Sequence, residues 1–364
     1  MGALTLADGR QMIPDATLDA GDKSCATGLL PLLKQAMRGI GVGEVVAVRS
    51  TARGLERDLP AWCRVAGHVY LGADGDGSYL LRRGGLPLAL ANAPAVLQEF
   101  WLFPVSPNWC NLACTHCLYA ASPRSPDRWR ISRAELLNVI AQLEEVGARP
   151  HFMVTGGEPT LHPELSDLLA LLDERGYSFQ LMTNGTIVNE RLAARLGDFK
   201  HLRKVQVSVE GDEPELNDRV YGAGVFERTM AGVRRLRERG VPVALAVTPM
   251  AENEARLTAI EQLARNAGAE VKYILLYPLG AAVEHEIRPA KKDPPLVKGD
   301  GRLMCDKGVA YSEGAYYPCT VLVKQPWAKL GDTLAEALST EARARVSAIR
   351  KRTPACEVCK RGST

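Results

Sequence analysis

Three cysteines near the middle of the chain have the residue type and the spacing of a metal centre. Cys110, Cys114 and Cys117 form the pattern C-x3-C-x2-C after a predicted strand. Three thiolates on one short loop can hold three irons of a 4Fe–4S cluster and leave the fourth iron open to a ligand. The alternative for this loop is a zinc ion with His116 as its fourth ligand.

Glycine-rich and polar motifs stand at the ends of three predicted strands beyond this loop. Thr155-Gly156-Gly157-Glu158-Pro159 ends one strand, Thr183-Asn184-Gly185 ends the next, and Ser208 and Glu210 end a third. Each motif taken alone is typical of an ordinary turn or a solvated strand end. Because active sites of α/β barrels lie at the carboxyl ends of the strands, we expect these motifs to share one site.

Four more cysteines lie near the C-terminus. Cys305, Cys319, Cys356 and Cys359 form the pattern C-x13-C-x36-C-x2-C, and Gly314 stands five residues before the second of them. Four thiolates suffice for one 4Fe–4S cluster without an open iron, which would carry electrons or tune the site. A structural zinc site is the alternative for these four residues.

The cysteine loop and the strand-end motifs together resemble the radical S-adenosylmethionine (SAM) superfamily over about residues 100–280. The resemblance implies that SAM binds the open iron and is cleaved to a 5′-deoxyadenosyl radical, which abstracts a hydrogen from a substrate. It also implies that the cofactor-binding residues lie around the ends of the strands: His116 near the adenine, Gly156, Gly157 and Glu158 at the amino group, Thr183 and Asn184 beside them, Ser208 and Glu210 at the ribose, and Arg219 at the carboxylate.

The C-terminal cysteines resemble the twitch and SPASM extensions of the same superfamily, which carry auxiliary iron–sulfur clusters. The number of cysteines favours a twitch-like region with one auxiliary 4Fe–4S cluster.

Alternating strands and helices must position these residues. Mostly apolar strands alternate with amphipathic helices from Phe100 onward, which predicts an α/β fold, a parallel sheet covered by helices in a partial (β/α)6 TIM-like barrel. The predicted strands are Phe100–Val105, Phe152–Thr155, Ser178–Thr183, Lys204–Val209, Pro242–Thr248 and Val271–Tyr277. The predicted helices are Arg133–Val146, capped by Ser132 and Glu135, then Pro163–Arg175, Asn189–Leu196, Phe226–Arg239 and Ala255–Ala267.

The first 84 residues predict a separate α+β unit with the element order β-α-β-α-β-β. Residues 17–71 resemble the TusA/SirA sulfur-carrier family through Leu18-Asp19-Ala20 and Asp58-Leu59-Pro60-Ala61-Trp62-Cys63. The resemblance implies that Cys25, at the start of a predicted helix Ala26–Met37, carries a persulfide. The prolines of the family's Cys-Pro-x-Pro motif are replaced by Ala26-Thr27-Gly28, and the alternative is a buried core thiol or a docking unit.

Composition and length set the remaining expectations. The 364 residues divide into residues 1–84, a linker at 85–99, a barrel at 100–280 and an iron–sulfur region at 281–364. A formal net charge of +3 is too small to indicate nucleic-acid binding. Because neither a signal peptide nor a membrane-spanning run is evident, we expect a cytoplasmic protein whose cysteines are ligands or reactive thiols.

The leading functional hypothesis is hydrogen abstraction in the biosynthesis of a sulfur-containing small molecule, peptide or cofactor. Expected partners are a small-molecule or peptide substrate, an electron donor such as flavodoxin or ferredoxin, and a cysteine desulfurase as sulfur source. Alternatives are a maturase for a ribosomally made peptide, a radical dehydrogenase with the auxiliary cluster as electron acceptor, and a non-catalytic metal-binding interaction protein.

Overall fold

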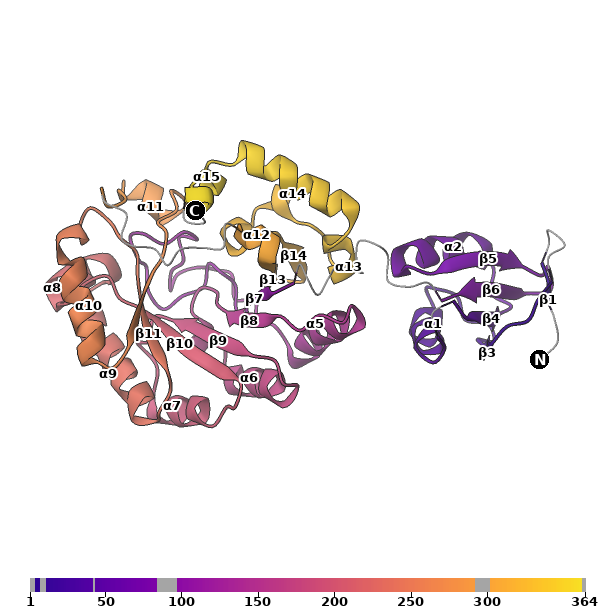
Figure 1. The fold of residues 1–364 in the computed structure, drawn as a ribbon, viewed down its shortest axis with the longest axis horizontal. Coiled ribbons are helices and arrows are strands. Elements are labelled where there is room, and N and C mark those ends of the chain that lie inside the picture. Colours follow the sequence, from indigo (N-terminus) through magenta and orange to yellow (C-terminus); the bar gives the residue numbers. More distant parts are fainter. Residues whose placement is uncertain (1–3, 7–10, 42, 84–96, 292–301, 362–364) are drawn as a thin grey trace. The chain divides into compact units, whose positions relative to one another are not determined.

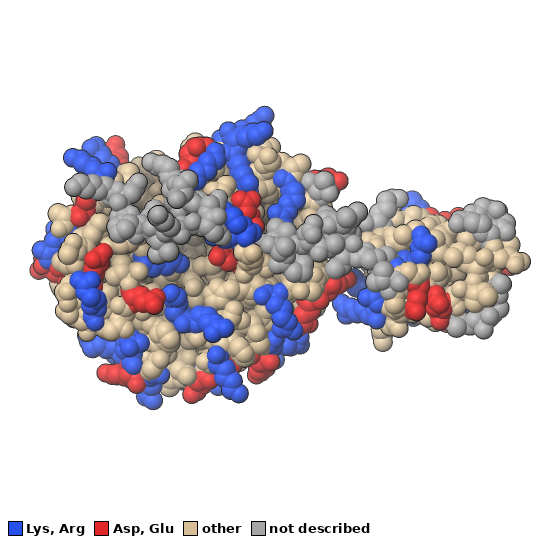
Figure 2. All heavy atoms as spheres, in the orientation of Figure 1, with Lys and Arg blue, Asp and Glu red and all other residues tan. Residues whose placement is uncertain are grey.

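The computed structural model describes the chain except residues 1–3, 7–10, 42, 84–96, 292–301 and 362–364 (Figure 1). The chain divides into two compact units, Met1–Ala93 and Pro94–Thr364. Within the described ranges, no helix has the length and apolar character needed to cross a membrane. Lysines and arginines are interspersed with acidic side chains over the face shown in Figure 2, in keeping with the small net charge.

The first unit is a four-stranded sheet with two helices. Its sheet order is β3-β4-β6-β5. Along the chain, α1 lies between β3 and β4 and α2 lies between β4 and β5, which gives the predicted element order. A short hairpin, β1–β2, precedes them and was not predicted from the sequence. The bounds are β1 Leu4–Thr5, β2 Gln11–Met12, β3 Ala16–Asp19, α1 Leu29–Arg38, β4 Val45–Arg49, α2 Leu55–Ala66, β5 Val69–Ala73 and β6 Ser78–Arg82.

The start of α1 differs from the prediction. The helix begins at Leu29, because Gly28 before it has a φ of +104°, a left-handed conformation that suits glycine. Cys25 therefore lies in a turn ahead of the helix and packs against the core of this unit. The prediction that Cys25 stands at the helix start is wrong.

The second unit contains one large sheet with the order β12-β11-β10-β9-β8-β7-β13-β14. The six strands from β7 to β12 are parallel and lie in chain order, at the six predicted positions, with helices on the outside of the sheet (Figure 1). The strands are β7 Glu99–Leu102, β8 His151–Val154, β9 Phe179–Thr183, β10 Leu202–Ser208, β11 Val243–Val247 and β12 Glu270–Tyr273. The helices are α5 Arg133–Glu145, α6 Leu165–Glu174, α7 Glu190–Gly197, α8 Pro214–Tyr221, α9 Val225–Glu238 and α10 Leu257–Asn266.

The two faces of this sheet differ in chemistry. Side chains alternate along each strand, and those on the helix-covered face are large, apolar and fully buried: Phe100, Phe152, Leu181, Val207 and Leu245. The opposite face borders a cavity and combines polar, charged and small side chains with three large apolar ones: Glu99, Thr155, Gln206, Ser208, Ala246 and Lys272, together with Trp101, Met153 and Met182. Because a parallel sheet covered on both faces is apolar on both, the polar and charged side chains of this polar face indicate a hollow interior built for a ligand.

The C-terminal region continues the same sheet. Strand β13 (Gly308–Ser312) pairs in parallel with β7 and antiparallel with β14 (Ala315–Tyr317). A Cβ atom at Gly308 would lie 1.7 Å from the carbonyl oxygen of Glu99, so only glycine permits this strand contact. The other helices of this region are α11 Ala281–Glu284, α12 Met304–Lys307, α13 Leu334–Ala337, α14 Thr340–Arg352 and α15 Pro354–Arg361.

Candidate functional site

The loop after β7 brings the three predicted cysteines to one cavity of about 170 Å³. Two of their sulfurs accept hydrogen bonds: Cys110 Sγ from the Leu112 N–H at 3.4 Å, and Cys117 Sγ from the Ala121 N–H at 3.4 Å. Burial raises the pKa of Cys110 to about 12, so without a bound cation this thiol stays protonated. N–H groups aimed at the sulfurs are the surroundings that thiolate ligands of an iron–sulfur cluster receive.

The glycine edge after β8 lies against this loop. A Cβ atom at Gly157 would stand 1.9 Å from the carbonyl oxygen of Trp109, the residue before Cys110. The neighbouring Glu158 N–H donates to the same carbonyl at 3.0 Å. The predicted glycine edge therefore packs directly on the cysteine loop, and Gly156 and Gly157 both line the cavity.

Glu158 differs from its expected role as a free carboxylate for the cofactor's amino group. The side chain is 1% exposed, and both of its oxygens accept hydrogen bonds. Its Oε1 accepts from the Thr160 N–H at 3.0 Å and the Thr183 hydroxyl at 2.7 Å, and its Oε2 accepts from the Asn184 N–H at 2.8 Å. Burial raises its pKa. Glu158 thus ties the end of β8 to the end of β9.

Asn184 connects the β9 end to the cysteine loop. Its Nδ2 donates to the Asn111 side-chain oxygen at 2.8 Å and to Cys110 Sγ at 3.7 Å. Its Oδ1 accepts from the Thr186 N–H at 3.0 Å. Asn184 is 9% exposed, so this is a buried brace rather than a free ligand group.

His116 and Glu210 form a buried pair beside the cysteines. His116 Nε2 lies 3.4 Å from Glu210 Oε1, which also accepts from the Tyr221 hydroxyl at 3.2 Å. Glu210 Oε2 accepts from the Thr248 N–H at 2.7 Å and the Asn253 amide at 3.3 Å. Burial raises the pKa of Glu210 to about 8 and lowers that of His116 to about 4, so both are neutral near pH 7.

The sequence did not point to Tyr221 or Asn253. The ring of Tyr221 meets the ring of His116 edge-on at 5.5 Å and borders the 170 Å³ cavity. The Asn253 amide also donates to the carbonyl oxygens of Glu210 and Thr248, which joins the ends of β10 and β11. In the sequence, Tyr221 and Asn253 look like ordinary residues of a helix end and a loop, and no motif marks them as site residues.

Arg219 is the predicted site residue that the structure does not bring to the site. It lies exposed on α8 and donates from Nε to the carbonyl oxygen of Glu215 at 2.9 Å. Helix α8 was absent from the prediction, and its turn places this side chain on the outer surface. Ser208, by contrast, borders the 170 Å³ cavity as expected.

The four C-terminal cysteines are gathered in the second unit. Burial raises the pKa of Cys319, and the charges of Cys305, Cys359 and Cys356 raise it further, which places all four in electrostatic contact. The described residues hold no group of three His, Cys, Asp or Glu side chains at the spacing of a single metal ion. The ligands of a cluster bind different irons and so stand further apart.

Two side chains lie beside the cysteines of this group. Arg350 donates from Nε to Cys305 Sγ at 3.1 Å, and its other guanidinium nitrogen pairs with Asp306. Burial raises the pKa of Tyr277, and Cys359 beside it raises it further; both residues border a larger cavity.

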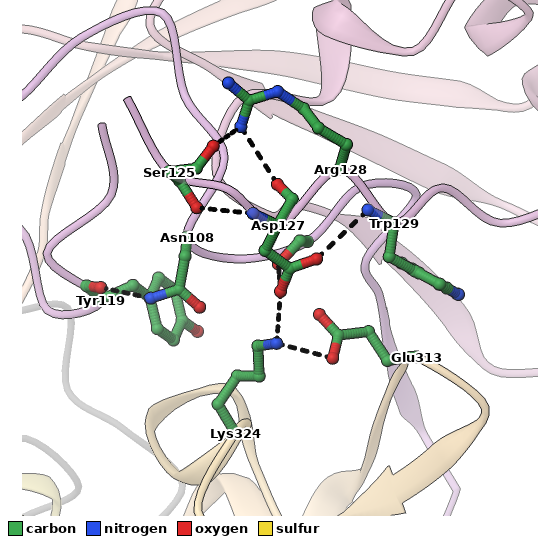
Figure 3. A network of polar contacts seen from close by, with 9 residues as sticks. Asn108, Tyr119, Ser125, Asp127, Arg128, Trp129, Glu313 and Lys324 are labelled. Carbon is green, nitrogen blue, oxygen red and sulfur yellow. Dashed lines mark hydrogen bonds and ion pairs between the residues drawn. The ribbon is translucent and has the colours of Figure 1, made fainter. Parts of the chain in front are cut away.

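A polar network fastens the cysteine loop to the C-terminal region (Figure 3). Lys324 Nζ binds the carboxylates of Asp127 and Glu313, the latter at 2.7 Å. Asp127 also accepts from the Ser106 hydroxyl at 2.7 Å. Burial would raise its pKa, but the hydrogen bonds from Lys324, Ser106 and the Trp129 N–H outweigh burial and lower it to about 2. The segment around Asp127 and the β13–β14 turn are therefore held together by charge.

A cavity of about 880 Å³ runs along the polar face of the sheet. It shares five lining residues with the smaller cavity: His116, Cys117, Thr155, Met182 and Ser208. It continues to Tyr277 and Cys359 on one side and to Glu99 and Lys272 on the other. The two cavities thus meet beside the cysteine loop.

Cys25, the predicted sulfur carrier, lies in the first unit. Burial raises the pKa of its thiol, and the charge of Asp58 raises it further. Its surroundings therefore favour the thiol over the nucleophilic thiolate.

Comparisons with known proteins agree with the geometry of the second unit. Residues 105–264 match the Radical SAM superfamily. The AdoMet-dependent heme synthase of Methanosarcina barkeri is 29% identical over 206 residues, covering 56% of this chain and 57% of that protein. The mycofactocin maturase MftC of Mycobacterium ulcerans is 32% identical over 183 residues, covering 50% of this chain and 48% of that protein. The chain spans about half the length of these curated relatives.

Solved structures share the fold at low sequence identity. Streptococcus suis SuiB bound to S-adenosylmethionine matches with a TM-score of 0.56 and 14% identity, over 72% of this chain and 71% of that chain. Native anSMEcpe with bound AdoMet matches with a TM-score of 0.55 and 16% identity, over 72% of this chain and 88% of that chain. Residues 105–264 therefore form a region that matches the Radical SAM superfamily, and the curated relatives that share it are a synthase and a maturase.

Proposed function

We propose that this enzyme holds a 4Fe–4S cluster on Cys110, Cys114 and Cys117, binds SAM in the 170 Å³ cavity, and abstracts a hydrogen atom from a substrate in the 880 Å³ cavity. The observation that carries the proposal is that the two cavities meet at the cysteine loop and share Thr155 and Ser208. A radical formed in one cavity would then face the substrate in the other.

The donor set fits a cluster with one open iron. The chain offers three thiols at this cavity, and N–H groups already point at two of the sulfurs. Gly156 and Gly157 both line this cavity, and the missing side chain of Gly157 lets the glycine edge pack directly on the cysteine loop. When bound, a reduced cluster supplies the electron that cleaves SAM and yields a 5′-deoxyadenosyl radical.

The residues of the chain position the site. Glu158 and Asn184 lock the ends of β8 and β9 to the cysteine loop, so the loop keeps one shape. Glu210, neutral at pH 7, holds the ends of β10 and β11 and fixes His116 at the cavity. We infer that the six strands act as the partial (β/α)6 barrel of this superfamily, because every one of them contributes residues to the larger cavity.

We further propose that Cys305, Cys319, Cys356 and Cys359 hold one auxiliary 4Fe–4S cluster, in a twitch-like region. Cys359 borders the larger cavity, which would bring this cluster within reach of the substrate. Four thiol ligands would leave no open iron, which suits electron transfer rather than substrate binding. An external donor such as flavodoxin or ferredoxin would reduce the first cluster.

The relatives suggest two substrate classes, a peptide and, from the AdoMet-dependent heme synthase, a tetrapyrrole; we propose the peptide. MftC is a maturase, and SuiB has been solved with its precursor peptide SuiA. Delivery of sulfur by Cys25 receives less support, because burial disfavours its thiolate and the helix begins beyond it.

Anaerobic reconstitution tests this proposal. Wild-type protein should bind about eight irons and form 5′-deoxyadenosine from SAM and dithionite. The triple variant Cys110→Ala, Cys114→Ala, Cys117→Ala should lose about four irons and all cofactor cleavage, and Cys25→Ala should lose neither. Protein that takes up zinc in place of iron, or that never cleaves SAM, would refute the proposal and favour a metal-binding interaction protein.

A further inference from the structure

Strand β12 is the last strand of the large sheet, and its outer edge is open. It pairs with β11, and no other described strand pairs with it. Ile274, directly after the strand, donates its N–H to the Val247 carbonyl oxygen at 2.8 Å, so the peptide groups of every second residue face β11. The N–H and C=O groups of Val271 and Tyr273 therefore face outward, and they form no hydrogen bond with any described residue.

The 880 Å³ cavity follows this open edge. All 4 residues of β12, Glu270–Tyr273, border it. Successive side chains of a strand stand on opposite faces of the sheet, so a cavity that borders all of them passes around the edge between the two faces. Arg265 of α10 borders the cavity on the helix-covered side, and Ser208 borders it on the polar face.

The side chain of Tyr273 is held away from the outer edge. Its hydroxyl donates to Glu261 Oε1 at 2.6 Å, which fixes the ring against α10. Val271 and Tyr273 are both half-buried, so solvent reaches this part of the strand. A row of unpaired N–H and C=O groups is a template for another extended chain, and proteins normally cover or blunt such a row. Here it lies along the cavity in which we place the substrate.

We propose that the substrate peptide binds in an extended conformation along β12, as an added strand of the large sheet. Its main chain exchanges hydrogen bonds with the N–H and C=O groups of Val271 and Tyr273. An extended peptide fits because its own N–H and C=O groups alternate with the same period as those of the edge. This binding mode rests on the proposed function and deepens it, since it states how a peptide is held beside the cysteine loop.

The edge leads toward the cysteine loop. Leu276, three residues beyond Tyr273, packs in the same apolar cluster as Cys110, Cys114 and Cys117. A strand rises about 3.3 Å per residue, so a chain paired at Tyr273 comes to the loop about 10 Å further on. The residue from which hydrogen is abstracted should therefore lie about three residues from the paired segment.

Hydrogen exchange of single amides tests the open edge first, on the full-length protein. Electron-transfer fragmentation of the proteolytic peptide that spans β12 gives the rate of each amide by mass spectrometry. The N–H groups of Val271 and Tyr273 should exchange at least about tenfold faster, relative to an unstructured chain, than that of Lys272 between them, which faces β11. Equal protection of the three amides would show that the edge is already covered and would overturn the proposal.

A model peptide then tests the added strand. The probe is acetyl-Lys-Thr-Val-Thr-Val-Thr-amide, because main-chain pairing gives affinity whatever the sequence and β-branched residues favour strands. At ten times its dissociation constant, taken from the same titration, it should slow exchange of the Val271 and Tyr273 amides about tenfold. Amides of β6 in the first unit should not change. No protection at about 10 mM peptide would overturn the proposal.

Two substitutions at one position separate main-chain pairing from side-chain contact. Val271→Pro removes the outward N–H and keeps the bonds to β11, because proline is tolerated where the N–H faces away from the sheet. With the Tyr273 amide as the reporter, Val271→Pro should raise the dissociation constant of the peptide about fivefold or more. Val271→Ala, which keeps the N–H, should change it less than about twofold. Equal effects of the two variants would contradict main-chain pairing.

A change in the peptide gives the same test on the unaltered protein. The probe with N-methyl groups on its four central residues lacks N–H donors on both of its edges, so it should not protect the Tyr273 amide. Protection equal to that of the parent peptide would overturn the added strand, even if Val271→Pro failed to fold.

Other occupants of the edge give other results. Coproporphyrin III, a tetrapyrrole, has no strand-like main chain, so equal protection by it would overturn strand addition in favour of a flat ligand. Protection that rises with protein concentration in the absence of peptide would assign the edge to a second copy of the chain, with the same consequence. Amide exchange reports binding and 5′-deoxyadenosine reports the proposed function, so either can fail while the other stands.

Discussion

The Tyr119 hydroxyl donates a hydrogen bond of 2.7 Å to the carbonyl oxygen of Thr320. Tyr119 follows Cys117 by two residues, and Thr320 follows Cys319 directly. This contact therefore joins the loop of the first cysteine group to the second group, far away in the sequence, in addition to the Lys324 network.

Tyr119→Phe should destabilise the unit Pro94–Thr364. The substitution leaves the Thr320 carbonyl without its donor, which should lower the free energy of unfolding by about 1–2 kcal/mol. Hydrogen exchange of the amides in β7 and β13 measures this unit by itself. Tyr316→Phe is the matched control, because the hydroxyl of that fully buried tyrosine has no partner among the described residues. Equal losses in the two variants would contradict the prediction.

Gly157→Ala should disrupt the cysteine loop. The added Cβ would stand 1.9 Å from the Trp109 carbonyl oxygen, so the loop must move away from the end of β8. We expect a loss of about 4 kcal/mol or more in stability and a loss of iron at the first cluster. Iron and sulfide content after reconstitution measures the loss of the first cluster.

Gly176→Ala provides the comparison for this variant. Gly176 has a φ of +71°, and a Cβ atom added there would meet nothing within 4 Å, so alanine causes backbone strain without a clash. It should cost about 1 kcal/mol and keep its iron. If Gly157→Ala also loads fully, the close packing of the glycine edge is not needed for the site.

The regular part of the second unit could be predicted from the sequence because its signals are local. Strand and helix periods and the Ser132 N-cap, whose hydroxyl accepts from the Glu135 N–H, are read within a few residues. The common site of the strand-end motifs could also be predicted, because the carboxyl ends of parallel strands meet at one edge of a sheet. The pairing of β13 with β7 joins segments about two hundred residues apart, and no local pattern encodes it.

The roles of individual site residues were harder to predict because they depend on surroundings. Glu158 and Glu210 are acidic at strand ends, yet burial and several donors make them braces rather than free ligands. The position of Arg219 depends on the start of α8 at Pro214, and that of Cys25 on the conformation of Gly28. The contacts of Lys324 with Asp127 and Glu313 required the folded chain.

The buried Glu210 should make stability depend on pH. Its pKa is raised to about 8 in the folded protein, and unfolding returns it to about 4.3. Between these two pKa values the folded protein holds one proton more than the unfolded protein. The stabilisation that protonated Glu210 gives is therefore complete below the pKa of the unfolded state and is lost as the pH rises to about 8. Between about pH 5 and pH 8, the free energy of unfolding should fall by about 1.4 kcal/mol per pH unit because of Glu210, and this contribution should level off above about pH 8.

Glu210→Gln should remove this dependence, because an amide does not titrate. Hydrogen exchange of β10 and β11 in wild type and variant, compared over that pH range, gives the difference directly. Glu190→Gln, at a residue whose side chain is 61% exposed, should keep the wild-type slope. Parallel curves for wild type and Glu210→Gln would show that Glu210 is already ionised in the folded protein.

Arg350 should set the reduction potential of the auxiliary cluster. Its guanidinium donates to Cys305 Sγ at 3.1 Å and is held in place by Asp306. Reduction adds negative charge to a cluster, and a cation bonded to one of its sulfurs stabilises the reduced form. Arg350→Gln should therefore lower the potential by about 60–130 mV, which corresponds to one charged hydrogen bond in a one-electron couple.

A redox titration followed by electron paramagnetic resonance measures this shift without any substrate. It is best made in the Cys110→Ala, Cys114→Ala, Cys117→Ala background, where the auxiliary cluster is the one that remains. Arg345→Gln is the matched control, because that arginine lies on the same helix and donates to the Trp327 carbonyl oxygen instead. A shift of equal size in both variants would reflect general charge on α14, and an unchanged potential in Arg350→Gln would mean that Cys305 is not a ligand of the cluster.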